Sequence, residues 1–429
     1  MARRQRAAAV CTLALLATVL AACGGSSGVP TLNWYINPDN GGQAELAAKC
    51  SAASNGAYRI STSVLPNDAT AQREQLVRRL AAKDSSIDLM SLDPVFVAEF
   101  AAAGFLRPFT PAEAADLTAG VLSGPIDSST WNGKLVAAPF WANTQLLWYR
   151  KSVAQKAGID PTRQPVTWDQ IIAGASQTGT TVEVQGNLYE GYMVWINALV
   201  ASAGGRILDN PEAGKNVRTA INSDAGRKAA SVVRELGRSK AADPALSTTD
   251  EEAARAAFEG PTGGFMVNWA YVYGAASEEV SSGSLSPSVL ADIGWTRYPR
   301  VDAGTESKPP LGGINLGVGA YGAHKDLAVQ AARCITTLPS QIQYMLKSKN
   351  PGARAAVYDD PQVRQTFPMA DDIRQSIDSS GPRPKTPYYT DVSSAVQRTF
   401  HPPASVDPAK APAEAAKLIK DVLHDKVLL

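Results

Sequence analysis

Histidine is scarce in this 429-residue chain, and its three histidines stand apart from one another. His324, His401 and His424 include no pair at the spacing that binds zinc, and the sequence has no Cys-x-x-Cys motif. A calcium-binding loop of the D-x-D-x-D-G type is also absent from the sequence. We therefore expect no metal site and no cofactor.

The chain also lacks an excess of basic residues, since 41 Lys and Arg face 40 Asp and Glu. The first 22 residues contain three arginines and no acid, so the remainder has 38 basic and 40 acidic residues, a net charge of −2. Nucleic-acid binding depends on dense lysine and arginine, so we expect no nucleic-acid partner. The length is sufficient for two domains, each with its own core.

The N-terminus has the pattern of a targeting segment. Three arginines precede an apolar stretch at residues 7–19 that is too short to span a bilayer well. The sequence L-A-A-C-G follows, and small residues immediately before a cysteine resemble a bacterial lipobox. We expect residues 1–22 to be a signal peptide, Cys23 to carry a lipid, and residues 23–30 to form a flexible tether at the outer face of the cell membrane. The alternative is an ordinary signal peptide with a chance cysteine.

Cysteine is rare as well, with four residues in all. Cys11 and Cys23 belong to the leader, so Cys50 and Cys334 remain in an exported, oxidising setting. A surviving pair in such a setting is usually bonded. We favour a disulfide between these two cysteines over two free buried thiols.

Strand and helix patterns alternate in the first hundred residues. Predicted strands at residues 32–36, 58–65 and 87–92 are separated by helical patterns. This order predicts a parallel sheet with right-handed crossovers, in which ligands bind beyond the carboxyl ends of the strands. Asn40 and Asp93 occupy such positions.

The chain is organised around residues 137–150, A-A-P-F-W-A-N-T-Q-L-L-W-Y-R. Apolar strand patterns flank a break at Pro139, and Asn143 is the polar interruption. We interpret this stretch as the first crossing from one lobe to another, with Asn143 lining a cleft. Residues 263–273 and 312–322 are the further candidates for crossings.

Two enzyme-like motifs occur in an unsuitable context. The G-x-S-x-G at residues 24–28 lies in the predicted tether, whereas a nucleophile elbow requires a strand before it and a helix after it. The G-x-G-x-x-G at residues 317–322 has no acid about 20 residues further on to bind a ribose. Neither motif predicts an enzyme.

Polar and aromatic residues gather at the predicted strand ends and crossings. Sugar recognition requires apolar ring faces together with planar amides or carboxylates that bind paired hydroxyls. Trp269 and Tyr192 are candidates for the ring faces. The candidate hydrogen-bonding residues are Asn40, Asp93, Asn143, Glu190, Glu251 and Arg383.

Two motifs, W-N-G-K-L-V-A-A-P-F at residues 131–140 and A-A-F-E-G-P-T-G-G-F-M-V-N-W-A at residues 256–270, resemble the substrate-binding proteins of ABC sugar importers, the superfamily of maltose-binding protein. The resemblance covers residues 31–429. It implies a type II periplasmic-binding-protein fold, in which two α/β lobes, each a mostly parallel sheet flanked by helices, are joined by crossing strands and close around the ligand. We expect residues 31–139 and 270–320 in lobe 1, and residues 140–269 and 321–429 in lobe 2.

Within that superfamily the sequence resembles the trehalose-binding lipoproteins of actinobacterial importers in N-T-Q-L-L-W-Y-R (143–150), V-N-W (267–269), G-G-I-N-L (312–316) and the Cys50/Cys334 pair. This resemblance implies a monomeric, non-enzymatic, lipid-anchored receptor that delivers trehalose or a near analogue to an ABC permease. The ligand-contacting residues that it implies are Asp93, Asn143, Glu251, Trp269, Gly313 and Arg383. Glu190 and Tyr192 match the maltose-binding pattern better.

Three alternatives remain. The same fold can bind a maltooligosaccharide or a glycerol-phosphate ester, although a phosphate ester requires several cations and Arg383 is the one predicted in the cleft. A secreted glycoside hydrolase can use two carboxylates such as Asp93 and Glu251. A surface adhesin needs no small ligand at all.

Overall fold

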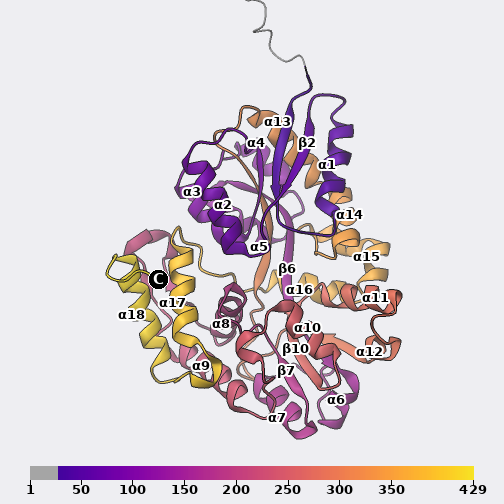
Figure 1. Cartoon of the computed structure of the whole chain (residues 1–429), viewed down its shortest axis with the longest axis vertical. Coiled ribbons are helices and arrows are strands. Elements are labelled where there is room, and N and C mark those ends of the chain that lie inside the picture. Colours follow the sequence, from indigo (N-terminus) through magenta and orange to yellow (C-terminus); the bar gives the residue numbers. More distant parts are fainter. Residues whose placement is uncertain (1–27) are drawn as a thin grey trace, which may run out of the picture.

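The computed structural model describes residues 28–429 as two α/β lobes, which Figure 1 shows one above the other with strand β6 running between them. This arrangement confirms the expected two-lobed fold. The predicted signal peptide and the predicted lipid-carrying residue, Cys23, lie outside the described residues.

The first lobe is built on the β-α-β pattern that the sequence predicts. Strands β1 (Thr31–Ile36), β2 (Arg59–Val64) and β3 (Leu89–Leu92) are parallel, with β1 in the middle. The sheet continues through β12 (Leu311–Val318), which is antiparallel to β3. Crossover helix α2 (Ala69–Ala81) is amphipathic and turns Leu76 and Leu80, four residues apart, into the core.

The remaining elements before β6 are α1 (Gly42–Ala53), η1 (Pro94–Phe96), α3 (Val97–Ala102), α4 (Pro111–Thr118), α5 (Ser123–Ser128), β4 (Thr130–Trp131) and β5 (Lys134–Leu135). Two late helices, α13 (Lys325–Ile335) and α14 (Leu338–Ser348), return to this lobe and pack on α1. Buried side chains of α13, together with Tyr344 of α14, share one core with β1.

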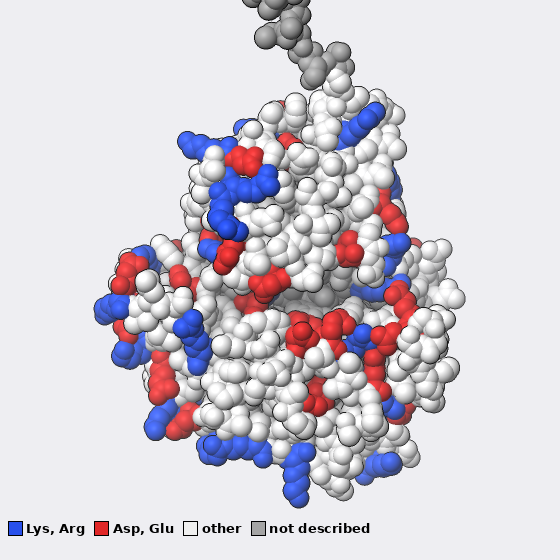
Figure 2. Space-filling model, in the orientation of Figure 1, with Lys and Arg blue, Asp and Glu red and all other residues white. Residues whose placement is uncertain are grey.

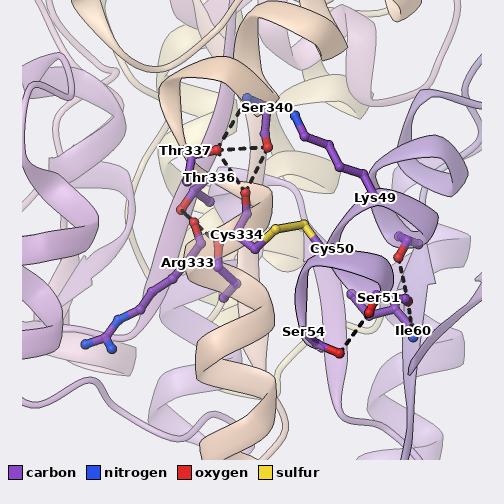
Figure 3. Close-up of a disulfide and its surroundings, with 12 residues drawn as sticks. Lys49, Cys50, Ser51, Ser54, Ile60, Arg333, Cys334, Thr336, Thr337 and Ser340 are labelled. Carbon is purple, nitrogen blue, oxygen red and sulfur yellow. Dashed lines mark hydrogen bonds between the residues drawn. A yellow bond between two sulfur atoms is a disulfide. The ribbon is translucent and has the colours of Figure 1, made fainter. Parts of the chain in front are cut away.

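A disulfide between Cys50 of α1 and Cys334 of α13 joins segments that are 284 residues apart in sequence, which confirms the predicted pair (Figure 3). Near the end of α13, the Cys334 carbonyl oxygen accepts hydrogen bonds from the hydroxyls of Thr337 and Ser340, at 3.0 and 2.9 Å. The disulfide therefore joins α1, the first helix of this lobe, to α13, which returns to the lobe late in the chain.

Strand β6 (Ala137–Arg150) belongs to both lobes. Its first part, as far as Thr144, pairs with β12. From Gln145 onward it pairs with β10 (Gly263–Trp269) and β11 (Ile293–Thr296). All of these pairings are antiparallel, so the sheet is mixed and its parallel strands lie away from the crossing.

The second lobe adds β7 (Thr181–Glu183), parallel to β10, and a large set of helices. These elements are α6 (Lys151–Lys156), α7 (Trp168–Thr178), α8 (Glu190–Ser202), β8 (Leu208–Asp209), η2 (Pro211–Asn216), β9 (Arg218–Thr219), α9 (Asp224–Arg238), η3 (Leu246–Thr248), α10 (Glu251–Glu259), α11 (Val272–Ser282), α12 (Pro287–Asp292), η4 (Ala355–Asp359), α15 (Pro361–Thr366), α16 (Ala370–Asp378), α17 (Tyr389–Phe400), η5 (Pro403–Ser405) and α18 (Ala411–Leu423).

Two segments pack against a different lobe from the one that the sequence analysis expects. After β10 the chain continues into α11 and α12 of the second lobe, and β11 pairs with the end of β6 there. Helices α13 and α14 pack in the first lobe. The chain thus returns to the first lobe along β12 and leaves it after α14. The sequence did not predict this path, because a buried strand pattern does not identify the strand with which it pairs.

Among residues 28–429, no helix has the length and apolar character needed to cross a bilayer. The same residues contain no group of three or more His, Cys, Asp and Glu side chains placed to hold a metal ion.

The disulfide leads to the first prediction. Because a cross-link across a long loop restricts the unfolded chain, replacing both Cys50 and Cys334 with alanine should lower the free energy of unfolding by about 2–4 kcal/mol. Urea unfolding of the double variant measures this change, and reduction of the wild-type protein should have a similar effect. An unchanged unfolding curve in both experiments contradicts the structural role of the bond.

Glu183 is a buried acid in the core of the second lobe. Its exposure is 0%, and neither carboxylate oxygen has a hydrogen-bond partner among the described residues. Burial raises the pKa of Glu183 to about 7. The folded protein therefore holds a proton at Glu183 at pH values where the unfolded chain has released it.

The second prediction follows from that raised pKa. As the pH rises from 4.5, the ordinary value for Glu183, to about 7, the free energy of unfolding should fall by about 3 kcal/mol, because the unfolded state alone gives up the proton. The Glu183→Gln variant should lack this component. Unfolding curves collected across the pH range test it, and identical pH profiles for the two proteins contradict it.

Candidate functional site

A cavity of about 600 Å³ lies between the lobes, and we call it the cleft. Figure 2 shows the hollow between the lobes with Asp and Glu side chains on both sides. The polar and aromatic residues that line the cleft are Asn37, Asn67, Asp68, Gln72, Asp93, Trp141, Asn143, Asn187, Tyr189, Glu190, Asp250, Glu251, Trp269 and Arg383. The floor is formed where β6 changes partners.

Asn143 sits at that change of partners, opposite Gly312 of β12. It is 8% exposed, and its Oδ1 accepts a hydrogen bond from the Thr144 amide at 2.9 Å. Within the described part of the chain, its Nδ2 group makes no hydrogen bond. The Asn143 side chain can therefore donate to a ligand in the cleft without losing an internal contact.

Trp269 ends strand β10 and is partly buried in the cleft lining. A Cβ atom at Gly312 would lie 2.9 Å from two carbons of the indole ring, so the missing side chain at Gly312 lets the ring approach β12. Gly313 has φ +124°, and a Cβ there would lie 2.3 Å from the Trp141 carbonyl oxygen. The backbone at both glycines thus depends on the absence of a side chain.

Arg383 connects the two lobes across the cleft wall. Its Nη2 donates to Asp93 Oδ1 at 2.9 Å and its Nη1 donates to Glu190 Oε1 at 2.6 Å. Asp93 follows β3 in the first lobe, whereas Glu190 begins α8 in the second. The Arg383 side chain is 2% exposed, so this cation is held between two acids away from water.

The Glu190 carboxylate accepts hydrogen bonds from several side chains inside the protein. Besides Arg383, the hydroxyls of Tyr389 and Ser393 donate to its carboxylate, the latter at 2.7 Å. Burial raises the pKa of Glu190, while Arg383 and the two hydroxyls act against that rise. Glu190 therefore holds Arg383 in place and has little remaining capacity for a ligand.

Glu251 opens helix α10 directly after Asp250, which caps the helix through the Ala253 amide at 2.8 Å. Tyr189 Oη donates to Glu251 Oε2 at 2.6 Å. Burial raises the pKa of Glu251, and the hydrogen bond from Tyr189 lowers it in part. Glu251 lines the cleft from the second lobe, as Asp93 does from the first.

Seven of the nine residues predicted from sequence line the cleft: Asp93, Asn143, Glu190, Glu251, Trp269, Gly313 and Arg383. Tyr192 does not, because it is 0% exposed in the core of the second lobe, where its hydroxyl donates to the Phe400 carbonyl oxygen. Asn40 is exposed beside the cleft but is not part of its lining. The prediction for Tyr192 is therefore wrong, while a ligand contact by Asn40 stays a prediction.

The sequence analysis missed several lining residues. Tyr189, which precedes Tyr192 by three residues, lines the cleft in its place. Asn37 directly follows β1, so the strand-end argument applied to Asn40 could have selected it. Asp68 and Gln72 come from the start of α2 and carry no sequence signal beyond helix capping.

Comparison with known proteins agrees with this architecture. The family model of bacterial extracellular solute-binding proteins matches residues 53–342. A probable ABC transporter-binding protein of Deinococcus radiodurans is 25% identical over 364 residues, which cover 81% of this chain and 82% of that protein.

Two solved structures share the fold. Maltose-bound MalE3 of T. maritima has a TM-score of 0.79 at 24% identity, with 91% of this chain and 99% of that chain covered. A solute-binding protein of an ABC transporter from Thermotoga lettingae TMO, bound with alpha-D-tagatose, has a TM-score of 0.76 at 20% identity, with 92% and 100% covered.

The geometry of Arg383 leads to the third prediction. Arg383→Ala leaves two partly buried carboxylates without their cation, so it should lower the free energy of unfolding by about 3–5 kcal/mol. Lys385→Ala is the matched control, because Lys385 lies on the same loop and pairs with Asp127 at 2.9 Å in a more exposed position. That control should cost less than about 1 kcal/mol. Equal losses in thermal or urea unfolding contradict the assignment.

Proposed function

Because the chain belongs to the family of bacterial extracellular solute-binding proteins, we propose that it captures trehalose, or a close disaccharide analogue, and delivers it to an ABC permease. The chain is an extracellular solute-binding protein of the ABC sugar importer type. The proposal concerns which sugar it takes and which residues hold that sugar.

The observation that carries the proposal is the combination of an aromatic face with acids from opposite lobes around Asn143. Trp269 offers an apolar surface to the C–H face of one sugar ring. Asp93 from the first lobe and Glu251 from the second offer oxygens to hydroxyl pairs. A cleft of about 600 Å³ lies within the size range of small-molecule sites.

Asp93 can bind a ligand while it holds Arg383. The Arg383 guanidinium and the Val95 amide both donate to Oδ1, at 2.9 and 3.1 Å. No described residue donates a hydrogen bond to Oδ2, so that oxygen can accept from a sugar hydroxyl. A ligand held by Asp93 and by Glu251 contacts both lobes, and such contacts favour the closed arrangement.

We also propose that Cys23 anchors the protein to the membrane through a lipid. The last residues of β1 lead into the cleft lining at Asn37, so Thr31 at the start of β1 is about 20 Å away along the strand. An anchor that precedes Thr31 therefore leaves the cleft open to ligand and permease.

Maltose and its oligomers are the second candidate ligands, because MalE3 of T. maritima shares the fold and is maltose-bound. A glycerol-phosphate ester is less compatible with the lining. Arg383 is the one Lys or Arg side chain that the described residues contribute to the cleft, and two carboxylates already neutralise it. Glu251, Asp250 and Asp68 would repel a phosphate.

The fourth prediction tests the sugar-binding role of Trp269. Trp269→Ala removes the apolar ring face, so isothermal titration calorimetry should detect no trehalose binding while the circular dichroism spectrum stays that of wild type. Trp295→Ala is the control, because Trp295 is a partly buried tryptophan of β11 outside the cleft, and it should bind trehalose as wild type does. Unchanged affinity in Trp269→Ala contradicts the assigned site.

The same protein sample distinguishes a receptor from a hydrolase. Prolonged incubation of the wild-type protein with trehalose should release no free glucose. Release of glucose that is lost in Asp93→Asn and in Glu251→Gln would establish a glycoside hydrolase instead.

A further inference from the structure

A second, smaller cavity lies directly beside the cleft. It has a volume of about 230 Å³, and we call it the α17 pocket because one face of α17 lines it. The cleft and the α17 pocket share the lining residues Asp68, Tyr189 and Glu190. These three side chains therefore form the wall between the two cavities.

Two members of this wall are fixed by the fold. Glu190 is bound by Arg383, Tyr389 and Ser393, as described above. Asp68 caps helix α2 by accepting the Ala71 amide at 2.8 Å. Removing either acid would disturb a buried ion pair or a helix start, so neither can be altered without a structural effect.

Tyr189 is held differently. Its side chain has one hydrogen bond in the described structure, from Oη to Glu251. The ring lies over Gly191, where a Cβ would be 2.2 Å from the tyrosine hydroxyl oxygen. Tyr189 occupies the N-cap position of α8 but its side chain makes no capping hydrogen bond. The Tyr189 side chain thus contributes no hydrogen bond to the start of α8.

The α17 pocket has the chemistry of a sugar-binding surface. Its hydroxyl and amide groups come from residues spaced three and four apart on one face of α17: Thr390, Ser393, Ser394 and Gln397. Thr390 Oγ1 is buried and has no hydrogen-bond partner among the described residues. The ring of Phe96 supplies an apolar surface on the first-lobe side.

We propose that Tyr189 sets the upper length of the ligand. The volume of the α17 pocket is somewhat less than half that of the cleft, so a cleft that takes two sugar units leaves space for about one more unit beyond Tyr189. The tyrosine ring blocks that space and restricts the wild-type protein to disaccharides. This inference rests on the proposed sugar-binding function.

The fifth prediction is tested with Tyr189→Ser, since serine is a favoured N-cap residue and preserves the start of α8. Calorimetry compares trehalose with trehalose extended by one glucose, and maltose with maltotriose. In wild type, the disaccharide of the preferred pair should bind at least about tenfold tighter than its trisaccharide, and in Tyr189→Ser the difference should largely disappear. Tyr189→Ala provides a second truncation with the same expected result.

Tyr189→Phe is the matched control, because it removes the hydrogen bond to Glu251 but retains the ring. It should keep the wild-type preference for disaccharides even if the overall affinity changes. An unchanged preference in both truncated variants overturns the inference, as does a shift in Tyr189→Phe that equals the shift in Tyr189→Ser, or a wild-type protein that binds both lengths equally. A wild-type protein that binds none of these sugars contradicts the proposed function itself.

Discussion

The arrangement of the whole molecule depends on the hydrogen bonding of one strand. The β6 backbone pairs with β12 as far as Thr144 and with β10 and β11 from Gln145 onward, so both lobes are bonded to a single continuous element. We expect the lobes to hinge at the point where the partners change. Asn143 lies at that point, and the ends of β10 and β12 meet there as well. The hinge and the floor of the cleft are therefore the same few residues.

The second constraint is the negative charge of the acidic side chains that line the cleft. Asp93 and Glu190 come from different lobes and share one buried guanidinium, so neither acid is left without a partner. The remaining acids of the lining, Asp68, Asp250 and Glu251, are held by backbone amides or by the Tyr189 hydroxyl. A neutral, hydroxyl-rich ligand suits such a lining, because hydroxyls donate to carboxylates without adding negative charge. Tyr189, which we propose limits the ligand length, also donates the hydrogen bond that holds Glu251.

Much of the fold and most of the site can be predicted from the sequence. The β-α-β start and the apolar strand patterns place Asp93 and Trp269 at strand ends, and they mark Asn143 as a polar interruption within the apolar strand β6. The lobe boundaries cannot be read in this way: β11 and β12 both have strand sequences, yet they pair in different lobes, and nothing local distinguishes their partners. The sequence does not distinguish Tyr189 from Tyr192, because α8 is buried on nearly all sides and has no polar face to show which tyrosine faces the cleft. The ligand contacts themselves stay predictions.

The central claim is that one disaccharide bridges the two lobes where β6 changes partners, and a crystal structure of the protein with trehalose tests it most directly. The account predicts that the sugar lies in the cleft, with one ring on Trp269 and with hydroxyls within hydrogen-bond distance of Asp93 in the first lobe and Glu251 in the second. A sugar bound elsewhere, or held by residues of one lobe alone, would contradict the account.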